Sequence, residues 1–140
     1  MNGFDSALAL EQVEEDVDKD GRQEPVDLWR TTRRLTYVAK DGSVFVVPLG
    51  FVTDGASIPR ALWSLIGDPL DTYAEAAVLH DYLYRTGCVT KEHADDLLLE
   101  AMETLDVGWL TRHTIWLGVY WFGGMAWNEN RNNDTKGAMA

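Results

Sequence analysis

The sequence HDYLY, residues 80–84, lies at the centre of the stretch 51–102, around which this chain is organised. The motif FVTDGASIPR, residues 51–60, precedes it, and an apolar helical pattern that contains Asp95 and Asp96 follows it. These three motifs are polar clusters in an otherwise apolar background. The arrangement indicates a functional site, and the other segments are interpreted around it.

A first helix is expected around HDYLY. Residues 72–85 are rich in alanine and leucine, which favour helix. His80 and Tyr84 are four residues apart and therefore share one face of this helix. Asp81 points about 100 degrees away around the helix axis, so His80 and Asp81 can contact different partners.

A second helix is expected after a short turn at Gly87 and Cys88. Thr90 is suited to be its N-cap, and the helix extends to about residue 105. Because the connection is short, the two helices become antiparallel neighbours, and Asp95 can lie beside His80. A carboxylate can then hold one imidazole nitrogen while the other faces a cleft, as a general base requires. The apolar face of the second helix has helical spacing and consists of Ala94, Leu97, Leu98, Ala101, Met102 and Leu105.

The order FVTDGASIPR, AAVLHDYLY, ADDLLLEAM resembles a small domain family of unknown function that is widespread in tailed phages, prophages and bacteria. The resemblance covers about residues 36–107, and its most specific motifs are FxTDxASIPR and HDxxY. It implies a phage-type protein that is located in the virion, in the phage tail, or in the host cytoplasm, with other phage structural proteins as partners.

A more distant resemblance is to secreted phospholipase A2, in which HDxxY lies on a helix between a glycine-containing loop and a second helix that bears Asp. It implies that His80 is the base that activates water, Asp95 orients His80, and Tyr84 hydrogen-bonds Asp95. It also implies a calcium ion as cofactor, held by Asp81 and by the loop residues Asp54, Gly55 and Ala56. Membrane lipid would then be the substrate. Unlike those disulfide-linked enzymes, this chain has a single cysteine, Cys88, and a shorter loop, TDGASIP.

Calcium fits this chemistry because it is a hard cation that several oxygens can coordinate, and a loop of carbonyls with one or two carboxylates supplies them. Such an ion polarises an ester carbonyl and stabilises the developing oxyanion while a base deprotonates water.

Structural explanations of the same motifs remain open. Asp54 and Gly55 can simply form a turn, and Ser57 can cap a helix that has Pro59 in its first turn. Asp95 and Asp96 can complement a helix dipole as first-turn acids, and Asp96 falls on a different face from Asp95.

A metal phosphohydrolase of the HD type is a third alternative for His80 and Asp81. That chemistry needs further histidine and aspartate ligands, which only His93 and His113 remain to supply. The three histidines and one cysteine show no zinc spacing.

Composition restricts the classes of function. The 140 residues, 46% of them hydrophobic, are enough for one domain with a core. A net charge of -11 argues against nucleic-acid binding and against a general attraction to anionic lipid. The first residues, MNGFDSALAL, do not resemble a signal peptide, because they have neither a basic region nor a long apolar one.

Three segments are expected: an acidic arm at 1–27, a globular domain at 28–127 and a polar tail at 128–140, either loose or docking. The arm has a weak apolar stripe that allows a short helix over about 6–17. In the domain, residues 28–32 suit a strand, and LTYVAK-DG-SVFVVP predicts a β-hairpin with a tight two-residue turn. The basic cluster of the chain is Arg30, Arg33 and Arg34, for which we expect a structural use.

Residues 108–127 contain four of the six tryptophans and predict an apolar helix. Its uncharged part, residues 115–127, would span about 20 Å, which is too short for a bilayer core of about 30 Å. We expect it to pack in the core, with another chain or lipid covering the rest.

The sequence therefore predicts an α+β fold: a small N-terminal hairpin or sheet, two antiparallel helices, and a Trp-rich C-terminal helix. Two functions remain. One is a virion or tail-associated hydrolase of envelope lipid esters that has a phospholipase A2-like calcium site. The other is a non-catalytic structural component of a phage tail or attachment apparatus.

Overall fold

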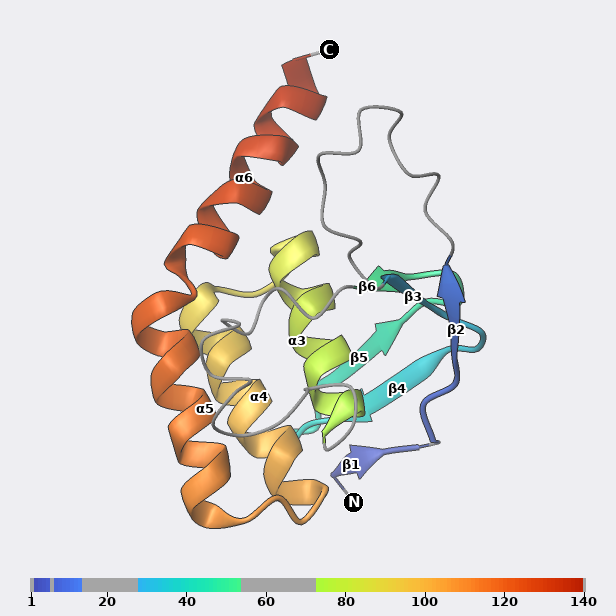
Figure 1. Ribbon diagram of the computed structural model, residues 1–140, viewed down its shortest axis with the longest axis vertical. Helices are drawn as coiled ribbons and strands as arrows, with labels where there is room; N and C mark the ends of the chain where they lie inside the picture. The colour runs from blue at the N-terminus through green and yellow to red at the C-terminus, as the bar shows by residue number, and fades with distance from the viewer. Residues whose placement is uncertain (1, 6, 14–27, 54–72, 140) are drawn as a thin grey trace.

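The computed structural model describes residues 2–5, 7–13, 28–53 and 73–139. Within these residues it contains two three-stranded antiparallel sheets followed by four helices, which confirms the α+β class (Figure 1). The strands lie on one side of the central helix α3 (Ala74–Thr86), and helices α4 (Lys91–Thr104) and α5 (Trp109–Phe122) lie on the other. Helix α6 (Gly124–Met139) extends away from this body towards the C-terminus.

The first sheet has the order β1-β4-β5 and contains the predicted hairpin. Strand β1 is Gly3–Phe4, β4 is Leu35–Val38 and β5 is Val44–Val47. The predicted two-residue turn is wrong: the amide of Ala39 donates to Ser43 and its carbonyl accepts from Gly42, leaving a three-residue loop. Gly42 has φ +88°, and glycine at this left-handed position allows the three-residue form of hairpin.

The second sheet has the order β2-β3-β6. Strand β2 is Leu10–Val13, β3 is Leu28–Thr31 and β6 is Val52–Thr53, so the strand expected near residue 28 is confirmed. The short helix allowed over 6–17 is corrected, because Leu10–Val13 pairs along its whole length with β3. Pairing with β3 satisfies the backbone N–H and C=O groups of this segment. A short helix here would have only a weak apolar stripe to pack against the rest of the domain, and helices of this length depend on such packing.

The acidic arm therefore contributes two described strands to the sheets, while residues 14–27 lie outside the described part. The described part of the arm also contacts the basic cluster, which has the structural use that we expected. Arg30 forms an exposed ion pair with Glu11 at 3.1 Å, and Arg33 donates to the carbonyl of Ala7.

The α3–α4 pair matches the prediction closely. Thr90 caps α4 by accepting a hydrogen bond from the His93 amide. Gly87 ends α3: its φ is +62°, and its amide donates a hydrogen bond to the Leu83 carbonyl. The predicted apolar face of α4 is buried at Ala94, Leu97, Leu98, Ala101 and Met102. Together with the buried face of α3 and Leu35, Tyr37 and Val47 of the first sheet, it forms the core.

The Trp-rich helix ends earlier than predicted. Helix α5 ends at Phe122, and Trp127 lies on α6, which continues through the residues expected to form a loose or docking tail. Arg131 attaches α6 to the body, because its guanidinium donates to the carbonyls of Tyr84 and Arg85 at the end of α3. Of the helices described, none has the length and apolar character needed to cross a bilayer.

Candidate functional site

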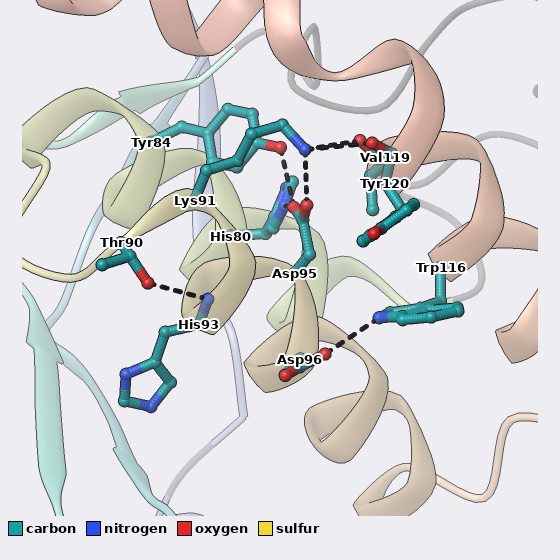
Figure 2. A network of polar contacts seen from close by, with 10 residues as sticks. All are labelled: His80, Tyr84, Thr90, Lys91, His93, Asp95, Asp96, Trp116, Val119 and Tyr120. Atoms are coloured by element: carbon teal, nitrogen blue, oxygen red, sulfur yellow. Dashed lines mark hydrogen bonds and ion pairs between the residues drawn. The ribbon is translucent and has the colours of Figure 1, made fainter.

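The HDYLY motif and Asp95 meet between α3 and α4, as predicted (Figure 2). His80 Nε2 lies 2.8 Å from Asp95 Oδ1, and the Tyr84 hydroxyl donates to the same oxygen at 2.7 Å. His80 and Tyr84 reach one atom because they are one helical turn apart on the face of α3 that packs against α4. The geometric part of the prediction, Asp95 beside His80 with Tyr84 bonded to Asp95, is confirmed.

This network is deeply buried. His80, Tyr84 and Asp95 each have 0% of their surface exposed. The rings of His80 and Tyr84 also contact each other, with centroids 4.2 Å apart. A buried carboxylate needs hydrogen bonds and a counter-charge to compensate for lost hydration. Each hydrogen-bond partner of Asp95 therefore contributes to keeping its charge inside the protein.

Lys91 supplies the counter-charge and was missed by the sequence analysis. Its Nζ lies 2.7 Å from Asp95 Oδ2, and it also donates to the carbonyls of Val119 at 3.0 Å and Tyr120 at 3.3 Å. These carbonyls belong to the last turns of α5, where a helix attracts positive charge. The signal that could have found it was the spacing, since Lys91 precedes Asp95 by four residues on a predicted helix.

The electrostatics of the network follow from these contacts. Burial raises the pKa of Asp95, but the hydrogen bonds from His80, Lys91 and Tyr84 outweigh it, so the pKa lies below the usual 3.8. Burial and the bond to Asp95 raise the pKa of the Tyr84 hydroxyl far above the usual 10. At neutral pH Asp95 is therefore a carboxylate, and Tyr84 is a neutral phenol that donates to it.

An ionised Asp95 also fixes the tautomer of His80. A carboxylate only accepts hydrogen bonds, so His80 Nε2 must carry the proton in the 2.8 Å contact. In a neutral imidazole, Nδ1 is then the nitrogen with the basic lone pair. Chemically, the arrangement is a histidine oriented by a carboxylate. Such a histidine can act as a general base, or the pair can simply brace two helices.

The proposed calcium ligands are only partly described. Asp81 is 3% exposed, and its Oδ1 lies 3.9 Å from Arg85 Nε. Asp54, Gly55 and Ala56 lie outside the described residues, as does the continuation to Ser57 and Pro59. The described chain approaches α3 at Phe51, whose ring packs edge-on against Tyr82, with centroids 5.5 Å apart. The described residues contain no cluster of three potential metal-ligating side chains, and the calcium and cleft predictions stay predictions.

The residues needed for an HD-type metal centre are not brought together. His93 extends away from the network in Figure 2, and its ring packs edge-on near Phe45. His113 stacks on Trp109 and bonds the carbonyl of that residue on α5. Asp96 is also apart from His80, as its predicted face requires, and accepts a hydrogen bond from the Trp116 indole.

The fold and the network define a small α+β domain built around a buried histidine–carboxylate pair. Residues 29–119 match a family described as "Protein of unknown function (DUF1353)". The chain belongs to this family, which confirms the domain of unknown function expected from the motifs.

A curated bacterial relative, the "Uncharacterized protein y4jT" of Sinorhizobium fredii (strain NBRC 101917 / NGR234), is 32% identical over 95 residues. The alignment covers 66% of this chain and 28% of the relative, so the chain corresponds to little more than a quarter of that protein. No solved structure gives a significant match.

Proposed function

We propose that this protein is an ester hydrolase in which His80 is the general base, acting on phospholipid with a bound calcium ion. The observation that carries the proposal is the contact of His80 Nε2 with the buried, ionised Asp95. A histidine held in this way keeps one tautomer and one ring orientation, which supplies the fixed geometry that a general base needs.

In the reaction, His80 Nδ1 accepts a proton from water as the water oxygen attacks the ester carbonyl. Asp95 stabilises the imidazolium that forms, and Tyr84 and Lys91 keep the Asp95 carboxylate in place. The imidazolium then returns its proton to the departing alcohol.

Calcium suits the donors proposed here. Asp81 offers a buried carboxylate next to His80, and Phe51 places the chain beside α3 shortly before Asp54, Gly55 and Ala56. Oxygen donors of this kind are the ligands that calcium prefers. Bound there, the ion would polarise the ester carbonyl.

The test is release of fatty acid from mixed phospholipid vesicles by the purified chain, with calcium or with a chelator. His80→Gln removes the base, and His93→Ala is the matched control, because His93 is exposed and outside the network. We expect release that needs both calcium and His80 and that His93→Ala leaves intact. Release without calcium would remove the metal from the proposal, and absence of release by the parent chain would remove the hydrolase.

A second candidate is a non-catalytic structural component of a phage tail or attachment apparatus, in which the same network braces three helices. It is supported by the surface of α5 and the start of α6, where large apolar side chains remain exposed. They are Trp109, Leu110, Leu117, Tyr120, Trp121, Phe122 and Met125. Several of these side chains exceed 60% exposure, and large exposed apolar surface of this kind is typical of an interaction site.

Other phage structural proteins would be the partners of this surface in an assembled virion. The two candidates are compatible, since a virion component can carry an enzyme. Cross-linking of assembled particles tests the second one: Trp121→Ser with Phe122→Ser should abolish links made by the parent chain. Incorporation of this double variant at the parent level would contradict it.

A further inference from the structure

Lys91 makes more contacts than it needs to neutralise the charge of Asp95. Its ammonium has three N–H donors and three acceptors: Asp95 Oδ2 on its own helix, and the Val119 and Tyr120 carbonyls on α5. The side chain is only 15% exposed. The ammonium is therefore held at a fixed point between α4 and α5.

This fixed point determines how the Asp95 carboxylate is rotated. One oxygen, Oδ2, is bound by Lys91, and the other, Oδ1, accepts from both His80 and Tyr84. The terminal torsion of an aspartate is soft, so burial alone does not decide which oxygen faces which partner. The anchored ammonium does decide it.

We propose that Lys91 is a positioning residue: it locks the Asp95 carboxylate so that Oδ1 holds His80 in its Nε2-protonated tautomer. As far as it concerns hydrolysis, this inference rests on the function proposed above. Lys91 itself does not act as an acid or base, since its donors are directed to Asp95 and α5. The end of α5 becomes part of the support of the proposed base, although α5 contributes no side chain to the His80–Asp95 contact.

Three variants separate this role from simple stabilisation. Lys91→Met keeps the aliphatic length and removes the ammonium, whereas Lys91→Arg keeps the cation. Lys40→Met is the matched control, because Lys40 forms an ion pair with Glu103 that is more than half exposed at both ends. Such exposed ion pairs contribute little to the stability of a protein.

The first readout is the side-chain nitrogen NMR spectrum of His80 in each folded variant. The parent chain and Lys40→Met should show a single tautomer with the proton on Nε2, and Lys91→Arg should retain it. Lys91→Met should show averaged nitrogen shifts instead. A Lys91→Met spectrum identical to that of the parent overturns the inference.

A measurement on the parent chain covers the case in which Lys91→Met does not fold. The Lys91 ammonium should give a nitrogen signal protected from solvent exchange, in contrast to that of Lys40. A rapidly exchanging Lys91 ammonium overturns the inference without any variant.

The second readout is kinetic and applies to vesicle hydrolysis. Lys91→Met should lower kcat by about 100-fold, the effect of a small misplacement of a catalytic group, with KM nearly unchanged. Lys91→Arg should restore part of kcat. A parent chain without activity would refute the hydrolase, while the NMR readouts still decide the role of Lys91; an active parent with full activity in Lys91→Met would refute the positioning role alone.

Discussion

Gly123, between α5 and α6, allows a close approach to the network that any larger residue would prevent. A Cβ built at this position would lie 2.6 Å from the Tyr84 hydroxyl and 2.5 Å from the Val119 carbonyl oxygen. Both distances are too short for a real contact. Gly123→Ala should therefore push aside the hydroxyl that donates to Asp95 and the turn that bonds Lys91.

The expected magnitude combines two opposing effects. Forcing a methyl group into a packed site costs about 1–3 kcal/mol. Replacing glycine by alanine in a right-handed helical conformation, which Gly123 has, recovers up to about 1 kcal/mol. We expect a net loss of about 1–2 kcal/mol in the free energy of unfolding, measured by urea denaturation.

The neighbouring glycine is the control. A Cβ at Gly124 would meet no atom within 4 Å, so Gly124→Ala should leave stability unchanged or raise it by about 0.5 kcal/mol. In a Tyr84→Phe background the hydroxyl is gone, and Gly123→Ala should cost less than in the parent chain, with a coupling of at least about 0.5 kcal/mol. Equal stability of the two alanine variants, or an equal cost of Gly123→Ala in both backgrounds, would refute the reasoning.

Three further predictions concern titration and the docking of α6. Because the pKa of Asp95 is lowered in the folded protein, its stabilising contribution is complete above about pH 4 and is lost as the pH falls through the folded pKa. Asp95→Asn should show a weaker dependence of unfolding free energy on pH below 4; an unchanged acid limb would contradict this. Because the pKa of Tyr84 is raised, its contribution is complete below about pH 10 and is lost at higher pH, so Tyr84→Phe should flatten the alkaline limb of the same profile. Arg131→Met should remove the donor to the Tyr84 and Arg85 carbonyls and increase hydrogen exchange in α6, but not in β4; uniform exchange across both would show that α6 is not a separate unit.

The sequence predicted the part of the fold that depends on local signals. Thr90 and Gly87 have the chemistry of a helix start and a helix end, and the structure uses both in this way. The spacing of His80 and Asp95 was sufficient to predict that they can meet, because a short connection leaves two helices few ways to pack. The Tyr84–Asp95 bond was predicted from the resemblance to phospholipase A2.

Apart from the length of the hairpin loop, the errors concern features that depend on distant partners. Strand Leu10–Val13 has too weak a pattern to identify alone, and its pairing with β3 decides its conformation. A side chain at Gly123, where α5 ends, would meet Tyr84, which is 39 residues earlier in the chain. Lys91 was predictable as a helical partner of Asp95, but its bonds to α5 required knowledge of where α5 ends.

The contacts of the buried network are also close together along the chain. Asp95 is 15 residues from His80 and 11 from Tyr84, whereas the Tyr37–Glu100 bond that ties the sheet to α4 joins residues 63 apart. Closing a short loop costs less chain entropy, and structures with local contacts form faster. The paired helices with His80 and Asp95 can thus assemble as an early folding unit, onto which the strands of the two sheets later condense.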